Sequence, residues 1–394
     1  MSNKKKKGPT PAKIISGKLH LWLGLASGLI VFIVSITGCI YVFEEEIREK
    51  MHREVLFVEP QAGKSFITAD AALAAVTTAF PGEKLKQLRV YSEPDRAWQV
   101  HLEKEMAVAI NPYSGAVISR FSRHDWLHTV EKIHTSLLLG EVGKWIIRVN
   151  ILIFLVLLIS GIVLWFPGNK ARRKQSFKVK WNASAKRVNY DFHNVFGFYS
   201  SLFLLVIVFT GMWWSFDWVK RTVYFVTGSP YEKKKEDEKK RMEPGMMMAG
   251  NNVFYSPVLA YQEASAKYPG ATETHINFPQ KKGEPIKLKL HYPYKWYRKT
   301  NDIQVDAVSG KVVRENLYAN YSAGDKFKHS NYDLHTGRFF GMGGKIFAFL
   351  LSLLAASMPV TGFAIWWVRK KKKSPAKKPV PANSAIPAFQ PAGA

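Results

Sequence analysis

The stretch DFHNVFGFYSSLFLLVIVFTGMWWSF, from Asp191 to Phe216, decides the fold. It is apolar for about twenty residues, and a helix that rises about 1.5 Å per residue crosses the roughly 30 Å hydrocarbon core of a bilayer over that length. We therefore expect a transmembrane helix. His193 lies at its entry, and an ionisable side chain on a membrane helix is a candidate functional residue. Gly211 follows about five turns later and lies on the same face.

The same pattern occurs near the N-terminus. In KLHLWLGLASGLIVFIVSITGCIYVF, His20 is followed by a glycine at the same distance. A second match aligns IHTSLLLGEVGKW (133–145) with LHTGRFFGMGGKI (334–346) without a gap, so that His134 falls on His335. The sequence therefore predicts a duplicated chain, in which each half has a span, a module, a histidine-bearing approach helix and a second span.

The composition indicates a membrane protein. Of the 394 residues 47% are hydrophobic, yet the formal net charge is +27. Lys and Arg cluster before the first span, between the second and third, and after the fourth, where the positive-inside rule places cytoplasmic segments. We therefore expect both termini in the cytoplasm and the two long connecting segments outside it. A nucleic-acid partner is not expected, because the charge lies at span ends rather than on one folded face.

The expected fold is an all-α four-helix transmembrane bundle of two repeats, with two small extracytoplasmic α+β modules. In each module an Ala-containing helix precedes short strands and a Gly-containing turn. The expected segments, in chain order, are a basic cytoplasmic N-terminus (1–17), the first span (18–43), the first module (66–120), an approach helix (124–142), the second span (143–166), a basic cytoplasmic loop (167–192), the third span (193–216), a charged Met-containing linker (231–252), the second module (254–318), an approach segment (325–343), the fourth span (344–368) and a disordered basic cytoplasmic tail (369–394).

Three local features have competing interpretations. Cys39 follows a sequence that resembles a lipoprotein cleavage site, but the apolar run is too long for a signal peptide, so we expect a core residue of the helix. Met246 to Met248 have the chemistry to bind a soft metal such as Cu(I), although a mobile linker is the favoured interpretation. The glycine run Gly341–Lys345 lacks the spacing of a phosphate loop and indicates helix packing.

The modules and the histidine-bearing spans resemble the PepSY-associated transmembrane proteins of bacterial inner membranes, over roughly residues 18–370. The most specific parts are the LH–G–TG spans and the two motifs at 133–145 and 334–346. That group includes periplasmic ferrisiderophore reductases that carry b-type haem. The resemblance therefore implies an inner-membrane protein with periplasmic PepSY-like modules that reduces ferric siderophores.

Four histidines are the candidate haem ligands. A haem iron bound by two imidazoles has no open position, so it transfers electrons rather than binding oxygen. Pairing His20 with His193 gives a site near the cytoplasmic face, and pairing His134 with His335 gives one near the periplasmic face. Two b-type haems would then carry electrons outward to a ferric siderophore or another ferric chelate, and Fe(II) would be released because hard oxygen ligands hold it less well.

The source of the electrons is expected to lie in another molecule. No GxGxxG fingerprint for a nicotinamide or flavin follows a strand in the sequence. The donor is therefore expected to be a separate cytoplasmic reductase or quinol.

His128 and His329 are candidate ligands of second rank. They lie six residues before His134 and His335 and therefore point about 240° away around a helix. They would ligate only if the approach helix turned the other way. The remaining histidines are expected to be surface or strand residues: His52, His101, His124, His275 and His291.

A haem-free membrane anchor is the alternative function. In that case the PepSY-like modules would bind or regulate a periplasmic peptidase or a cell-wall partner, and the protein would not be an enzyme. The four repeated histidines would then have no role, so the colour of the purified protein separates the two hypotheses.

Overall fold

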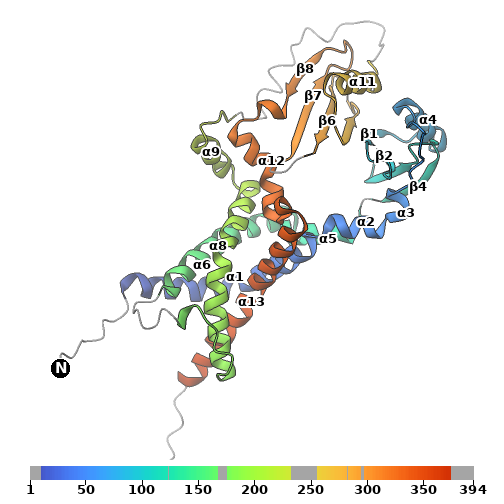
Figure 1. Cartoon of the computed structure of the whole chain (residues 1–394). Helices are drawn as coiled ribbons and strands as arrows, with labels where there is room; N and C mark the ends of the chain where they lie inside the picture. Colours follow the sequence, from blue (N-terminus) through green and yellow to red (C-terminus); the bar gives the residue numbers. More distant parts are fainter. Residues whose placement is uncertain are drawn as a thin grey trace, which may run out of the picture.

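The computed structural model describes residues 10–122, 124–166, 175–231, 255–281, 283–293 and 297–373. A bundle of long helices lies at one end of the molecule and a β-sheet at the other (Figure 1). We call these the bundle and the sheet, and the end of the bundle next to the sheet is the sheet end. The predictions for Met246 to Met248 and for the tail beyond residue 373 fall outside the described residues.

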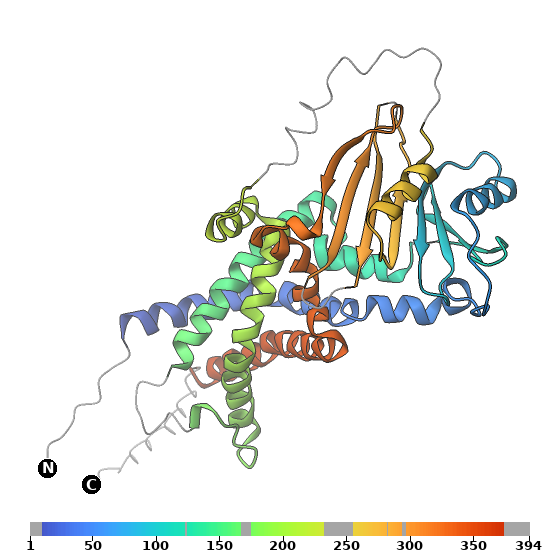
Figure 2. The same cartoon turned by 45° about the horizontal axis from the view of Figure 1, so that its top comes forward.

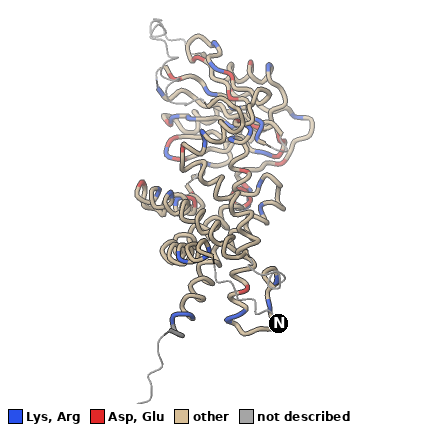
Figure 3. The backbone as a smooth tube through the Cα atoms, turned by 90° about the vertical axis from the view of Figure 1, so that its left-hand side faces the viewer, with Lys and Arg blue, Asp and Glu red and all other residues tan. Residues whose placement is uncertain are grey.

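Four helices of the bundle are long and apolar enough to cross a membrane. They are α1 (Pro11–Tyr41), α6 (Gly140–Trp165), α8 (Ala185–Ser215) and α13 (Gly341–Lys373). Helices α1 and α8 each contact both α6 and α13, so the four helices form a closed ring. Large apolar side chains such as Leu29, Phe203 and Leu350 face outward, as expected of a surface in contact with lipid. Figure 3 shows Lys and Arg at the ends of the bundle and few charges along its middle.

Eight strands form a single antiparallel sheet in the order β4-β3-β2-β1-β5-β6-β7-β8. The strands are β1 (Leu85–Tyr91), β2 (Trp98–Leu102), β3 (Met106–Ile110), β4 (Val117–Ser122), β5 (Glu273–Asn277), β6 (Ile286–Tyr292), β7 (Lys299–Val305) and β8 (Val312–Asn316). The two groups of strands expected from the sequence are thus joined through β1 and β5, with Leu88 opposite Ile276. Strand order runs outward from this junction in the same way in both halves.

One hydrophobic core extends across both halves of the sheet. It packs against α4 (Ala69–Ala79) and α11 (Pro257–Lys267), which lie beside the sheet in Figure 2. Each of these helices begins at a hydroxyl N-cap: Thr68 accepts a hydrogen bond from the amide of Ala71, and Ser256 accepts from the amides of Val258 and Leu259.

Two shorter helices lead from the sheet to the bundle. They are α5 (Trp126–Ser136), capped by Asp125, and α12 (Ala323–Thr336), capped by Ser322. After α5 the chain turns through Leu137 and Leu138, which have positive φ, and enters α6. After α12 it turns at Gly337 (φ 75°), passes through the short 3₁₀ helix η3 (Arg338–Phe340) and enters α13. These turns place each approach helix beside the start of the next long helix.

Ion pairs between charged side chains connect the segments at the sheet end of the bundle. Helix α2 (Glu44–Met51) continues from α1 and is followed by α3 (Arg53–Leu56). Lys345 of α13, only 5% exposed, donates to Glu46 at 2.6 Å and to Glu45 at 3.2 Å. Asp333 of α12, fully buried, accepts from Arg298 at 3.1 Å. The remaining helices at this end are α9 (Asp217–Val226) and the 3₁₀ helix η2 (Tyr318–Asn320).

Candidate functional site

The structure brings the four first-rank histidines together as two pairs. The ring centroids of His20 (α1) and His193 (α8) lie 6.2 Å apart with an interplanar angle of 84°. Those of His134 (α5) and His335 (α12) lie 6.3 Å apart at 77°. His134 and His335 lie on the two helices that lead from the sheet to the bundle, whereas His20 and His193 lie in the first halves of α1 and α8, whose last residues are at the sheet end. Each pair takes one ring from each half of the chain.

The second-rank histidines take part in neither pair. His128 is on α5, where its ring centroid lies 4.4 Å from that of His124, and it faces a cavity beside the sheet. His329 stacks on Tyr321, with ring centroids 4.4 Å apart. The structure thus brings His134 and His335 together and leaves His128 and His329 outside both pairs.

A hydroxyl on a neighbouring helix contacts the Nδ1 atom of each paired histidine. The four contacts are His20 with Ser160 at 3.0 Å, His193 with Thr361 at 2.8 Å, His134 with Thr37 at 3.1 Å and His335 with Thr210 at 2.9 Å. Every ring is therefore tied at Nδ1 to a long helix other than its own. Such a contact fixes the orientation of an imidazole that uses its other nitrogen for a ligand.

The partners of these nitrogens determine the tautomer at the sheet end. His134 Nδ1 also lies 2.9 Å from the carbonyl oxygen of Val34, and His335 Nδ1 lies 3.0 Å from that of Ile207. Because a carbonyl only accepts, Nδ1 must carry the proton in both rings. The Nε2 atom of each neutral ring then keeps its lone pair for a metal.

The same reasoning applies at the other pair. Ser160 donates its hydroxyl proton to the carbonyl of Leu157, and Thr361 donates to that of Ser357. With that proton engaged, each hydroxyl oxygen accepts from the histidine Nδ1–H. In all four rings Nδ1 is thus the donor, and in the neutral form of such a ring Nε2 is the atom with a free lone pair.

A glycine follows each of these hydroxyl residues and makes room for the ring. A Cβ atom at any of the four glycines would lie 3.3 to 3.4 Å from the Cε1 atom of the histidine. The glycine–histidine contacts are Gly161 with His20, Gly362 with His193, Gly38 with His134 and Gly211 with His335. Gly211 lies on the same helix as His193, as expected, but it contacts the other pair. Along α1 and α8 the histidine and the distant glycine therefore belong to different histidine pairs.

The sequence reasoning missed the hydroxyl residues. The signal was present, because each of the four spans has Ser or Thr directly before the matched glycine. A Ser or Thr within a helix commonly donates its hydroxyl to a carbonyl one turn earlier in the same helix. Thr37, Thr210 and Thr361 do make this bond. The additional role of their oxygen atoms depends on a second helix that the local sequence does not specify.

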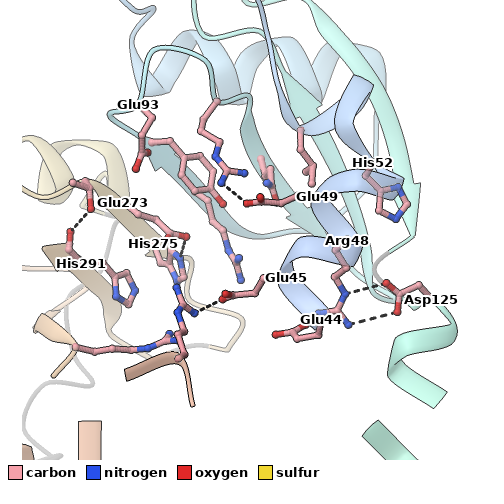
Figure 4. Close-up of a pocket in the computed structure, with 18 of the residues that line it drawn as sticks. Glu44, Glu45, Arg48, Glu49, His52, Glu93, Asp125, Glu273, His275 and His291 are labelled. Carbon is pink, nitrogen blue, oxygen red and sulfur yellow. Dashed lines mark hydrogen bonds and ion pairs between the residues drawn. The ribbon is translucent and has the colours of Figure 1, made fainter. Parts of the chain in front are cut away.

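A polar cavity of about 940 Å³ lies between the sheet and the sheet end of the bundle. Figure 4 shows its walls, with Glu45 and Arg48 of α2 on one side and His275 and His291 of the sheet on the other. Arg48 donates to Asp125 at 2.9 Å, and Arg338 pairs with Glu45. The cavity is therefore lined by both carboxylates and guanidinium groups. Its lining includes Asp125, which precedes α5, and Arg338, which precedes α13.

Two histidines that were expected to be ordinary strand residues face each other in this cavity. The ring centroids of His275 and His291 lie 4.7 Å apart. Burial and then the neighbouring His275 lower the pKa of His291 to about 4. Its Nε2 atom is buried without a hydrogen-bond partner, while Nδ1 lies 3.2 Å from the hydroxyl of Thr300. Burial raises the pKa of Glu273, but the hydrogen bond from His275 outweighs it and the result is about 2.

Acidification is expected to destabilise the sheet through His291. In the unfolded chain this histidine binds a proton with a pKa near 6.5, whereas in the fold it does so only near 4. Between these values the unfolded state binds more protons, so the free energy of unfolding falls as the pH is lowered from about 6.5 to about 4. The His291→Phe variant should lose part of this dependence. Thermal unfolding in detergent between pH 7.5 and 4.5 measures it, with His124→Phe as a control at an exposed histidine. Parallel curves for wild type and His291→Phe would contradict the assignment.

Within the described ranges, no group of three or more His, Cys, Asp or Glu side chains is arranged to hold a metal ion. The candidate site therefore consists of the two histidine pairs and the cavity beside the second pair. Cys39, the one cysteine of the sequence, is buried in α1 with a free thiol.

Comparison with known proteins identifies the family. A search of curated proteins found no match to the chain. The family model described as the PepSY-associated TM region matches residues 18–369, which include all four long helices over most of their length, the sheet and both histidine pairs. The chain is therefore a membrane protein that belongs to the PepSY-associated TM region family.

Proposed function

We propose that this protein is a di-haem b oxidoreductase of the bacterial inner membrane that reduces ferric siderophores or other ferric chelates on the periplasmic side. The two histidine pairs are the main observation that supports this function. Each pair offers two imidazoles, one from each half of the chain, with Nδ1 already engaged in a hydrogen bond.

The spacing of the rings fits a shared metal. Two imidazoles that approached one metal through Nε2 from opposite sides, each at about 2 Å, would have ring centres about 6 Å apart. The observed separations are 6.2 and 6.3 Å. Only two protein ligands converge at each place, and this number suits haem because the porphyrin supplies the other donors to iron. His20 with His193 and His134 with His335 would hold one haem each.

The charge distribution supports the orientation. Lys and Arg gather at the termini and around the loop between α6 and α8, so these parts would face the cytoplasm. The sheet, in two halves that we interpret as PepSY-like modules, would then lie in the periplasm. Electrons would come from a cytoplasmic reductase or from quinol on the His20–His193 side.

The residues of the protein have distinct tasks in this function. Bound haem supplies a reversible one-electron couple. The hydroxyls of Ser160, Thr361, Thr37 and Thr210 orient the imidazoles, so little rearrangement accompanies a change in charge. The cavity is lined by Glu131 of α5 and Arg338 of η3, close in sequence to His134 and His335. It is within the size range of small-molecule sites, and its guanidinium and carboxylate groups suit a polar chelate. Fe(II) would leave such a chelate because hard oxygen ligands hold it less tightly than Fe(III).

Absorption spectroscopy tests the proposal directly. Protein purified in detergent from haem-replete cells should be red, should contain about two haems per chain, and should show a dithionite-reducible b-type spectrum. Addition of a ferric hydroxamate chelate to the reduced protein should reoxidise it and release Fe(II), which a chromogenic Fe(II) chelator detects. A colourless preparation would refute the oxidoreductase and leave the haem-free anchor for a peptidase or cell-wall partner as the remaining hypothesis.

A further inference from the structure

Two asparagines reinforce the histidines of the second half of the chain. Asn189 lies one helical turn before His193, and its amide donates to the carbonyl oxygen of Thr361 at 3.1 Å. Asn331 lies one turn before His335, and its amide donates to the carbonyl oxygen of Thr210 at 3.2 Å. In both cases the threonine that accepts from the asparagine also holds the histidine through its hydroxyl.

The first half of the chain lacks this arrangement. The residues one turn before His20 and His134 are Ser16 and Val130. Neither side chain has an amide that can donate to the backbone of the neighbouring helix. Each histidine pair therefore has one ring whose helix is tied to its threonine by an asparagine, and one ring without such a tie.

Asn331 is maintained at an energetic cost. It is only 1% exposed, and its Oδ1 atom is buried without a hydrogen-bond partner. A buried acceptor without a partner lowers the stability of the fold. The corresponding place in the first half holds Val130, which is buried with no polar atom to satisfy. Packing alone would favour an apolar residue, so the donation to Thr210 is the feature that distinguishes Asn331.

We propose that Asn331 and Asn189 are positioning residues that fix, in each histidine pair that would hold haem, the one histidine from the second half of the chain. This inference rests on the proposed function. The amide ties the backbone of the histidine's helix to the threonine, while the hydroxyl of the same threonine ties the ring. Two bonds to one residue leave the ring little freedom to tilt. His335 and His193 are therefore the fixed ligands, and His134 and His20 are the adjustable ones.

Haem loss measures this difference without relying on catalysis. Oxidised full-length protein in detergent is mixed with an excess of apomyoglobin, and haem transfer is followed from the Soret band. Asn331→Val, which installs the residue found in the first half, and Asn331→Leu, which keeps the shape but not the donor, should each accelerate the loss of one haem about 10-fold, as for other residues that orient metal ligands. The phase of haem transfer that is accelerated should be the phase that is absent in the His335→Ala variant.

A matched control and a double variant separate positioning from packing. Val130→Leu changes a buried apolar residue at the equivalent place and should leave both phases near the wild-type rate. Thr210→Val removes the hydroxyl but keeps the carbonyl that accepts from Asn331. Because both bonds orient the same ring, the double variant should lose haem less rapidly than the product of the two separate effects. Unchanged haem loss in both Asn331 variants, or full additivity with Thr210→Val, would overturn the inference. A wild-type protein without haem would instead refute the proposed function itself.

Discussion

Replacing His335 with alanine is expected to lower the haem content from two per chain to one and to reduce ferric-chelate reduction to background. His335 supplies one of the two rings at the sheet end, and no second histidine lies in position to replace it, since His329 stacks on Tyr321. The His20–His193 pair is formed by other helices, so its haem should remain and should still be reduced by dithionite. Pyridine haemochromogen analysis and reduced-minus-oxidised spectra provide the measurement.

The neighbouring histidine supplies the control for this experiment. His329→Ala removes an imidazole from the same helix, six residues earlier, and should retain both haems. His193→Ala should give the complementary result, with loss of the haem remote from the sheet. Two haems in His335→Ala, or loss of one in His329→Ala, would show that the sheet-end ligands are wrongly assigned.

Replacing Gly344 with alanine is expected to destabilise the protein and to loosen the sheet-end haem. A Cβ atom at Gly344 would lie 2.1 Å from the carbonyl oxygen of Gly337 and 2.8 Å from the Cβ of Phe340. Neither the backbone nor the turn can avoid this overlap without shifting the segment that follows His335. Overpacking of this kind costs about 1 to 3 kcal/mol, and more where backbone must move.

The adjacent glycine provides the control variant for this experiment. Gly343 is on the same helix turn, but a Cβ atom there would meet nothing within 4 Å. Gly343→Ala should therefore be neutral, or stabilise α13 by up to about 1 kcal/mol through its better helix propensity. Thermal unfolding in detergent, with the Soret band as a second probe, compares the two variants. Equal unfolding temperatures would show that the turn after α12 is not as tightly packed as the structure indicates.

The sequence was informative wherever the governing interaction is local or repeats along the chain. Four apolar runs identified the long helices, because crossing a bilayer imposes a length that the sequence must meet. The gapless match between His134 and His335 indicated that these residues occupy equivalent places, and the structure brings their rings together. Haem binding by these residues stays a prediction.

The sequence was less informative where distant segments meet. Strand β7, KTNDIQV, is polar and was not identified as a separate strand, yet Thr300 and Asn301 are buried within the sheet. The pairing of β1 with β5 joins residues nearly 190 positions apart, and no local pattern specifies which edges meet. The cavity combines α2, the strands and the start of α5, so it could not be recognised from any one of them.

The junction between β1 and β5 has a consequence for how the molecule is made. During synthesis β1 emerges long before β5, so the edge of β1 that later pairs with β5 presents an unsatisfied row of backbone donors and acceptors. Such an edge invites mispairing with other nascent chains until two further membrane insertions have delivered its partner. Shielding of the β1 edge until β5 has been made would therefore reduce mispairing during synthesis.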